Sequence, residues 1–431
     1  MPVVGMVGGG QLARMTAAAA IGLGATFRVL SESENESAAL VTRDATIGSH
    51  RSLSDITAFA AKCDVITFDH EHVPGEILVK LESDGVLVRP GSGALKYTQD
   101  KLAMRERLSA LGIPCPRFAP VASLADVEAF VGGTQPRYGA PPASQSARPW
   151  PGRRSDDRGT REERRGKDRG PERAAASGAS RVSAGKIVLK AVSGGYDGKG
   201  VWVCQSSGEV EDVLAHGIPL MAEEFVPFRR ELAALVARSP SGQGAAYPIV
   251  QTVQVDAICR EVIAPAPGLL PDVAVEAEAL ALKIAAELGV TGLLAVELFE
   301  TDRGGLLVNE LAMRPHNSGH WTIEGARTSQ FEQHLRAVLD LPLGSCAPPE
   351  GTFTVMANLL GGTDPDVFDR FLHVMAADPA VKVHFYGKEV RPGRKIGHVT
   401  IVGGPDDDVA DVRDRARRAA SYLRWGTEEG N

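Results

Sequence analysis

The feature of the sequence that most constrains the fold is a short turn between two apolar segments that each carry a glutamate. Residues 293–301 (LLAVELFET) and 306–314 (LLVNELAMR) flank DRGG, which is a hairpin turn signal. If the turn centres between Arg303 and Gly304, paired positions sum to 607, and Glu297 lies opposite Glu310. Any even-length loop keeps both carboxylates on one face of the hairpin, whereas an odd loop separates them.

Two carboxylates that face each other repel unless a cation lies between them. Magnesium is bound through one or two carboxylates together with substrate phosphates, so Glu297 and Glu310 form a candidate magnesium site. Asn309, beside Glu310, can add a neutral oxygen. The alternative is an ordinary strand pair whose acidic side chains face solvent.

A second informative segment is the glycine-rich loop SGGYDGKG at 193–200. It joins a strand that ends in Lys190 to a strand that starts at Val201, and its four glycines leave backbone amides open to phosphate. It is not a Walker A loop, because a strand follows it. We expect a flexible flap, with Lys190 and Lys101 as candidate phosphate partners. The alternative is a plain long hairpin beside solvated lysines.

The first hundred residues alternate strand-like and helix-like patterns, which predicts a parallel, doubly wound sheet. The expected strands are 3–7, 25–31, 64–69 and 86–90, with a helix at 11–24.

The turn Gly8-x-Gly10-x-x-Ala13, followed by Glu32, matches the dinucleotide-binding fingerprint. A nicotinamide-dependent dehydrogenase is therefore an alternative. The same strand–turn–helix also serves as a plain cradle for phosphate or substrate.

Later segments continue the mixed pattern, without an internal repeat. The expected helices are 98–114, 123–131, 271–289 and about 328–340; the expected strands are 186–192, 200–204, 219–226, 231–239, 247–256, 352–360, 381–387 and 395–403.

Composition restricts the class of protein. A chain of 431 residues with 43% hydrophobic and 23% charged residues suggests about three globular domains. The net charge of −7 argues against a nucleic-acid partner. No run of 18 apolar residues and no signal-peptide pattern is present, so we expect no membrane contact. Five dispersed cysteines without a CxxC pair favour the cytoplasm.

The composition changes at 134–184, where twelve Lys and Arg accompany six Asp and Glu, with many Gly, Pro, Ser and Ala. This stretch has too few apolar side chains to offset the entropy of ordering, so it predicts a disordered insertion. A basic arm for nucleic acid or an acidic partner is the alternative.

A polar segment, NELAMRPHNSGHW at 309–321, follows the second glutamate of the hairpin. It brings together Arg314, His316, Asn317 and His320. A fixed guanidinium with neighbouring amide donors suits a small planar oxyanion. We interpret His320 as an ordinary buried histidine.

Several strings in the sequence resemble the N5-carboxyaminoimidazole ribonucleotide synthases, a family of ATP-grasp ligases. They are GGGQLARM, TFDHEHVP, QDK, GGYDGKG, AEEFVPFRRE, NELAMRPHNSGHWT and YGKEVRPGRKIGH. The resemblance implies an α/β and α+β fold of ATP-grasp architecture, usually as a homodimer. It comprises a doubly wound pre-ATP-grasp domain (1–97), a two-subdomain ATP-grasp domain (98–340, with the insertion 134–184) and a small β-rich C-terminal domain (341–431).

The resemblance also implies roles for individual side chains. ATP would contact Lys101, Lys190, Gly195, Tyr196, Asp197, Gly198, Lys199, Gly200, Val201, Glu223, Glu224, Phe225, Val226, Glu231, Gln254, Asn309 and Glu310. Glu297 and Glu310 would hold Mg2+, and Arg314 and Asn317 would position bicarbonate. Aminoimidazole ribonucleotide would lie near Gln11, Leu12, Glu71, Tyr196 and Asp197, with its phosphate at Lys388 and Arg394.

The implied reaction is the ATP- and bicarbonate-dependent carboxylation of the ribonucleotide amine in purine biosynthesis, through carboxyphosphate, with release of ADP and phosphate. Lys190, Arg314 and Asn317 would act by positioning and charge stabilisation, and the closed flap would exclude water. Asp197 is a candidate acceptor for the amine proton. Another ATP-grasp carboxylate–amine ligase is an alternative within the same superfamily.

Three positions depart from the family pattern. Lys199 stands where arginine is usual, which replaces a planar fork of donors by a point charge. Gln254 stands where some members have histidine, and Met313 replaces a usual proline before Arg314.

Overall fold

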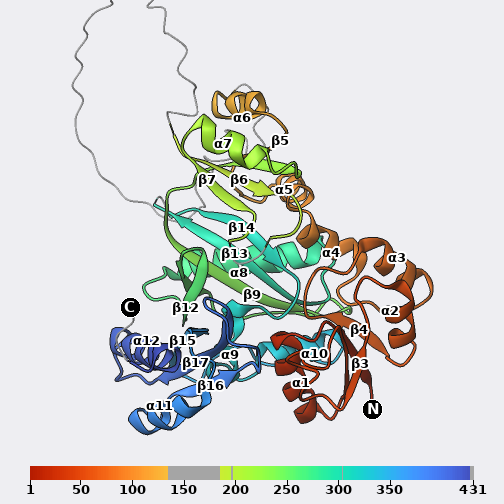
Figure 1. Cartoon of the computed structure of the whole chain (residues 1–431), viewed down its shortest axis with the longest axis vertical. Helices are drawn as coiled ribbons and strands as arrows, with labels where there is room; N and C mark the ends of the chain where they lie inside the picture. Colours follow the sequence, from red (N-terminus) through yellow and green to blue (C-terminus); the bar gives the residue numbers. More distant parts are fainter. Residues whose placement is uncertain (134–184, 196–197, 303, 428–431) are drawn as a thin grey trace, which may run out of the picture.

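The computed structural model describes residues 1–133, 185–195, 198–302 and 304–427, which form three β-sheets surrounded by helices (Figure 1). The insertion predicted at 134–184 and the flap residues Tyr196 and Asp197 lie outside the described residues. In Figure 1, a long central sheet has the small sheet of β5 to β8 above it and the N- and C-terminal parts on either side below.

The first sheet consists of four parallel strands in the order β3-β2-β1-β4, as the alternating pattern predicted. Its strands are β1 (Val3–Val7), β2 (Thr26–Ser31), β3 (Asp44–Ile47) and β4 (Val65–Phe68), with helices α1 (Gln11–Leu23), α2 (Leu53–Ala60) and α3 (Gly75–Ser83).

The prediction of a strand at 86–90 is wrong. Only Val88 forms an isolated bridge, to Ile66 of β4. Pro90 cannot donate a ladder hydrogen bond, and the chain then enters a helix, so pairing stops after one residue.

The single helix predicted at 98–114 is also wrong in its boundaries. The structure has two helices, α4 (Ser92–Gln99) and α5 (Lys101–Ala110), separated by Asp100. The Asp100 carboxylate accepts the N–H of Ala103 at 2.8 Å, which is the usual N-cap arrangement. This cap makes Lys101 the first residue of α5.

The small sheet is antiparallel, with the order β5-β8-β6-β7. Its elements are β5 (Phe118–Val121), β6 (Ile187–Ala191), β7 (Val201–Cys204) and β8 (Leu220–Glu224), with α6 (Leu124–Val131) and α7 (Ser207–Leu214). Strands β6 and β7 pair Lys190 with Val201, so the predicted antiparallel strands on both sides of the glycine loop are confirmed.

The central sheet is antiparallel and has nine strands, in the order β14-β13-β9-β11-β12-β15-β17-β16, with β10 paired to β9. The strands are β9 (Phe228–Arg238), β10 (Gly244–Ala246), β11 (Val250–Val255), β12 (Ile258–Ala264), β13 (Gly292–Thr301), β14 (Leu306–Ala312), β15 (Phe353–Leu360), β16 (Lys382–Phe385) and β17 (Lys395–Gly403). The helices are α8 (Pro271–Glu287), α9 (Thr322–Gly325), α10 (Gln330–Val338), α11 (Phe371–Ala377) and α12 (Val409–Trp425), with the short helices η2 (Asn317–Gly319) and η3 (Phe368–Arg370).

Strand β12 joins the C-terminal strands to the rest of the sheet, because it pairs with β15. We did not expect this strand from the sequence, since Arg260 and Glu261 interrupt its apolar run. Glu261 is 5% exposed and forms ion pairs with Arg413 and Arg417 of α12. The predicted domain boundary at 340/341 therefore falls between strands of one continuous sheet.

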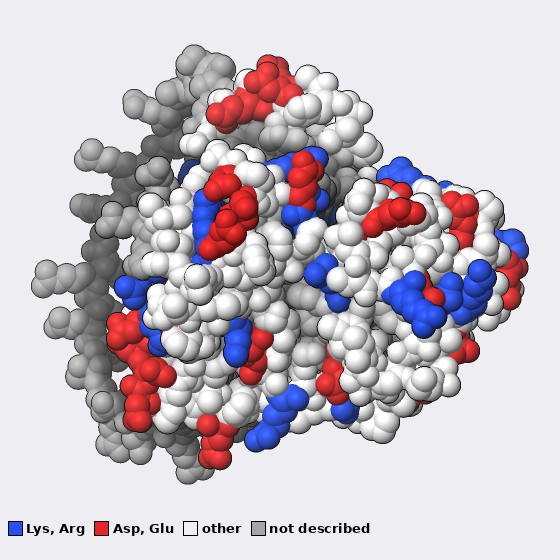
Figure 2. Space-filling model, turned by 60° about the horizontal axis from the view of Figure 1, so that its bottom comes forward, with Lys and Arg blue, Asp and Glu red and all other residues white. Residues whose placement is uncertain are grey.

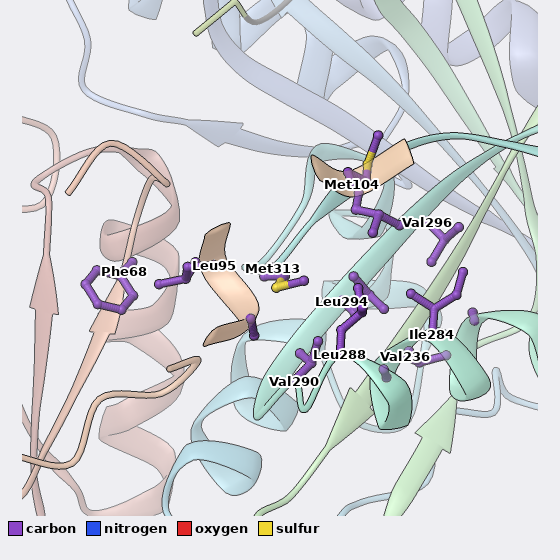
Figure 3. Close-up of a cluster of buried hydrophobic side chains, with 14 of the residues drawn as sticks. Phe68, Leu95, Met104, Val236, Ile284, Leu288, Val290, Leu294, Val296 and Met313 are labelled. Atoms are coloured by element: carbon purple, nitrogen blue, oxygen red, sulfur yellow. The ribbon is translucent and has the colours of Figure 1, made fainter. Parts of the chain in front are cut away.

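The largest apolar core joins the N-terminal part to the central sheet. In Figure 3, Phe68 and Leu95 approach Met313, which lies beside Leu294 of β13. Burial of this kind contributes roughly 25 cal/mol per Å2 of apolar surface, so the core fixes the carboxylate hairpin against the first sheet.

The surface carries mixed charge. Figure 2 shows Lys and Arg side chains interspersed with Asp and Glu on the face drawn. No helix in the described ranges is long and apolar enough to cross a membrane.

Candidate active site

A cleft of about 1340 Å3 brings together residues from the N-terminal part, the small sheet and the central sheet. Most of the predicted site residues line it: Gln11, Leu12, Glu71, Lys101, Lys190, Gly195, Gly198, Val201, Glu223, Glu224, Phe225, Val226, Glu231, Gln254, Glu297, Asn309, Glu310, Arg314, Asn317 and Arg394. Lys199, Gly200 and Lys388 lie outside this lining. Tyr196 and Asp197 belong to the residues that the structure does not describe.

The carboxylate hairpin pairs Glu297 with Glu310, as predicted, but for a different reason. Nearer the turn, Leu298 pairs with Val308, so these positions sum to 606 and the loop is odd. A β-bulge at Asn309 adds one residue to β14 and brings the two glutamates back into register. The expectation of an even loop is therefore wrong, while the pairing of the carboxylates is confirmed.

Asn309 and Glu310, on either side of the register shift, are consecutive residues that both line the cleft. The Lys190 ammonium donates to Asn309 Oδ1 at 3.0 Å, and the Lys101 ammonium forms an ion pair with Glu310. The two predicted phosphate-binding lysines and the acidic hairpin therefore meet at one point. Each ammonium lies where it could transfer from a carboxylate or amide oxygen to a phosphate oxygen.

Glu223 of β8 has a role in the structure beyond the ATP contact that the family resemblance implies. Its side chain is 2% exposed and forms ion pairs with Arg105 at 2.6 Å and Lys190 at 2.7 Å. Burial alone would raise the pKa of Glu223, but the two cations outweigh it and lower the pKa to about 2. A carboxylate charged at all ordinary pH values thus holds Lys190. We did not predict Arg105 from the sequence. It lies four residues after Lys101, so the two side chains share a face of α5, and this spacing was the available indication.

Two other glutamates that line the cleft, Glu297 and Glu231, have pKa values that are raised rather than lowered. Burial, with the negative charges of Glu310 and Glu231 nearby, raises the pKa of Glu297 to about 7. Burial also raises the pKa of Glu231 to about 7. A divalent cation would relieve this repulsion, because it favours the charged form of each carboxylate.

The donor set fits magnesium only if a nucleotide completes it. Among the described residues, no group of three or more His, Cys, Asp or Glu side chains could hold a metal ion. Magnesium dehydrates reluctantly and is usually bound by one or two carboxylates plus substrate phosphates. Glu297, Glu310 and the amide oxygen of Asn309 match that pattern.

The loop after β14 carries a fixed guanidinium. Arg314 Nε donates to Glu71 Oε2 at 2.9 Å, and the same carboxylate accepts the Met313 N–H at 3.2 Å. Asn317 exchanges two amide hydrogen bonds with Asn358, at 2.9 and 2.7 Å. Met313 stands where proline is usual in the family. Its backbone N–H makes a hydrogen bond to Glu71 that a proline could not make.

The two histidines of this loop differ in position. The Nε2 atom of His316 lies 3.7 Å from Glu297, and burial together with the charge of Arg314 lowers the pKa of His316 to about 3. His316 is therefore neutral and faces the carboxylate hairpin. His320 is fully buried, contacts Gln330 at 2.9 Å and does not line the cleft, in agreement with the expected core position.

Aromatic side chains line the end of the cleft near β9. Phe228 and Phe299 stack with ring centroids 4.6 Å apart, and Phe225 is 40% exposed. Both stacked rings and Phe225 belong to the lining, as do Glu231 and Gln254. Flat apolar walls of this kind suit a purine base. Sequence reasoning missed Phe228 and Phe299.

At the other end of the cleft, the turn from Gly8 to Gly10 does not present free backbone amides to a dinucleotide. Asp69 accepts the N–H groups of Gly10 at 2.7 Å and Ala13 at 2.9 Å. These are the positions at which a pyrophosphate would bind in the dinucleotide fold, and Glu32 is paired with His50 at 2.8 Å. The nicotinamide alternative is therefore wrong. Lys388 contacts Gln11 at this end.

Family models match three parts of the chain. A ribonucleotide synthetase preATP-grasp domain matches residues 1–99, an ATP-grasp domain matches 173–331, and a phosphoribosylaminoimidazole carboxylase C-terminal domain matches 354–412. Together they confirm the predicted fold class.

Relatives extend over the full length. An N5-carboxyaminoimidazole ribonucleotide synthase of Mycobacterium tuberculosis is 50% identical over 432 residues, covering 99% of this chain and 88% of the relative. A crystal structure of an ADP complex of such a synthetase matches with a TM-score of 0.80 and 29% identity, over 99% of this chain and 98% of the other. The synthase of Aspergillus clavatus in complex with ADP and 5-aminoimidazole ribonucleotide matches with a TM-score of 0.79 and 27% identity, over 98% of both chains.

Proposed function

Because this chain belongs to the N5-carboxyaminoimidazole ribonucleotide synthase family of ATP-grasp ligases, we propose that the cleft residues described above perform the reaction of that family. The enzyme uses ATP to carboxylate the amine of 5-aminoimidazole ribonucleotide, giving N5-carboxyaminoimidazole ribonucleotide in purine biosynthesis. The carboxylate hairpin carries the assignment of roles, because Glu297 and Glu310 face each other beside Lys101 and Lys190.

ATP lies, in this proposal, with its base against Phe225, Phe228 and Phe299 and its phosphates at Lys101 and Lys190. The two lysines exchange their present partners, Glu310 and Glu223 or Asn309, for phosphate oxygens. Glu297 and Glu310 would hold Mg2+, which neutralises phosphate charge when bound. By the family resemblance, the flap that contains Lys199 would cover the phosphates; Tyr196 and Asp197 lie outside the described part of the chain.

Bicarbonate binds at Arg314 in this scheme. The guanidinium is oriented by Glu71, which occupies one edge of its fork and leaves other N–H donors for an oxyanion. Asn317 is held by Asn358, so its amide is oriented before the anion arrives. Preorganised donors cost little reorganisation when charge develops.

The ribonucleotide lies between the first sheet and the C-terminal strands. Gln11 and Leu12 begin α1, and Glu71 follows β4, so all three extend from the carboxyl edge of the parallel sheet. This edge is where open α/β sheets bind ligands. Lys388, in contact with Gln11, and Arg394 supply positive charge for the phosphate.

The reaction then proceeds in two steps. A bicarbonate oxygen attacks the γ-phosphorus of ATP, and the bond from that phosphorus to the β-phosphate oxygen breaks to give carboxyphosphate and ADP. The ribonucleotide amine attacks the activated carbon, or carbon dioxide released from it, and phosphate leaves. The amine loses one proton, for which Asp197 is our proposed acceptor. Positioning and charge stabilisation supply most of the acceleration.

We also propose that the enzyme works as a homodimer in the cytoplasm. Five dispersed cysteines, all free, suit a reducing compartment.

A reaction assay tests the proposal. ADP formation by the purified protein is measured with the ribonucleotide and bicarbonate omitted in turn, and with Glu310→Ala. We expect ADP formation to require both substrates and to be lost in the variant, while the circular dichroism spectrum is unchanged. ADP formation at an equal rate without the ribonucleotide would contradict the assigned substrate. Unchanged magnesium dependence in the variant would contradict the assigned metal ligands.

A further inference from the structure

A fully buried arginine lies behind the cleft without lining it. Arg105 of α5 is 0% exposed, and it is not among the residues that line the cleft. Burying a guanidinium costs several kcal/mol unless every donor is paired, so a buried arginine needs strong partners. Arg105 has three partners on two different sheets.

The first partner is Glu223 of the small sheet, whose Oε1 atom accepts from Arg105 Nε at 2.6 Å. The other carboxylate oxygen of Glu223 holds Lys190 at 2.7 Å. Arg105 therefore fixes the carboxylate that orients the phosphate-binding lysine. This contact alone would make Arg105 a neighbour of the nucleotide site.

The other two partners are backbone carbonyls of the central sheet. Arg105 donates to the carbonyl of Val308 at 3.0 Å and to that of Asn309 at 2.7 Å. Asn309 is the bulged residue, and β14 is the edge strand of the sheet, so among the described strands it pairs with β13 alone. An edge strand has backbone groups without a ladder partner, and here one guanidinium satisfies two of them.

We propose that Arg105 is a positioning residue that locks the β14 bulge and thereby aims Asn309 and Glu310 at the metal and phosphates. The inference rests on the proposed function of the hairpin. Arginine reaches the carboxylate and the two carbonyls through three different nitrogens of its planar fork, whereas lysine presents three donors from a single nitrogen. Lysine at this position could keep the ion pair with Glu223 but not all three contacts.

The test compares Arg105→Lys with Arg107→Lys. Arg107 lies on the same helix, but its side chain is 38% exposed, and among the described residues its guanidinium pairs with Glu287, at 3.8 Å through the carboxylate and 3.3 Å through the backbone carbonyl. Hydrogen exchange is followed in the peptide that contains residues 306–312. The Mg2+ concentration that gives half-maximal ADP formation is measured on the same preparations, together with the KM for the ribonucleotide.

We expect Arg105→Lys to exchange faster at 306–312 and to need about fivefold more Mg2+, since each lost hydrogen bond contributes about 1 kcal/mol. The KM for the ribonucleotide should stay within about twofold, because that ligand binds at the far end of the cleft. Arg107→Lys should match the unsubstituted protein in all three measurements.

Unchanged exchange in Arg105→Lys would overturn the proposal, and so would faster exchange with an unchanged Mg2+ requirement. Should Arg105→Lys fail to fold, Glu223→Gln is compared with the double variant Arg105→Met, Glu223→Gln, which removes both members of the buried ion pair while both variants lack the carboxylate that holds Lys190. The double variant must then show the faster exchange that the single variant lacks. If the unsubstituted protein formed ADP without Mg2+, this result would instead contradict the proposed function of the hairpin.

Discussion

The raised pKa of Glu297 makes magnesium binding depend on pH in a way that can be calculated. A carboxyl group must lose its proton before it can bind a cation, so metal affinity falls when the free group is protonated. Burial and the charges of Glu310 and Glu231 place the pKa of Glu297 near 7 in the absence of metal. The affinity is therefore fully present above pH 7 and decreases as the pH falls below it.

The size of the effect follows from that pKa. A group with a pKa of about 7 is roughly one-tenth protonated at pH 8 and nine-tenths protonated at pH 6. The apparent affinity of the ADP-bound protein for Mg2+ should then be about tenfold weaker at pH 6 than at pH 8. This corresponds to about 1.4 kcal/mol.

Isothermal titration of Mg2+ into the ADP-bound protein at pH 6, 7 and 8 measures this change. Glu297→Gln is the matched control, because it keeps the shape of the side chain and removes its titration. Protonation of the nucleotide affects both proteins equally, so the difference between the two pH profiles reports the titration of Glu297 together with its coupling to Glu231. Parallel profiles, within about twofold, would refute the reasoning that the carboxylate both titrates near pH 7 and binds the metal.

Three further predictions concern other parts of the cleft and the chain. Lys388→Ala should raise the KM for the ribonucleotide with little change in that for ATP, because Lys388 contacts Gln11 far from the hairpin; steady-state kinetics checks this, and a large loss of ATP affinity would contradict it. Glu71→Gln should lower kcat/KM for bicarbonate about tenfold, since a hydrogen bond to a charged group contributes about 1.5 kcal/mol and Arg314 would lose its orientation. Initial rates at varied bicarbonate test this expectation, which a change of less than about twofold would exclude. Deletion of 134–184 should leave turnover largely intact, because loop length affects closure entropy only logarithmically; a folded deletion variant without activity would show the opposite.

The sequence predicted the parts of the site that depend on local chemistry. The paired glutamates, the antiparallel strands around the glycine loop and the loop with Arg314 all follow from short segments whose side-chain types restrict their use. The family resemblance then supplied the ligand classes. Local patterns were sufficient where the neighbours in space are also neighbours in sequence.

The parts that the sequence did not predict depend on distant contacts. Arg105 reaches Glu223 across 118 positions of sequence, and no local pattern indicates such a partner. The bulge at Asn309 compensates for an odd loop, so counting residues in the turn led to the right pairing by the wrong route. Asp69 occupies the amides of the glycine turn, which a motif alone could not reveal.

The pairing of β12 with β15 has a consequence for how this protein can be divided. A fragment that ended before β15 would leave β12 with a bare row of backbone donors and acceptors, which invites association with other chains. A chimera of two relatives would therefore have to take β12 and the C-terminal strands from the same parent. Strand β12 lies in the segment that the ATP-grasp model matches, and most of β15 lies in the segment that the C-terminal-domain model matches, so the limits of these models do not mark a place at which the protein can be divided.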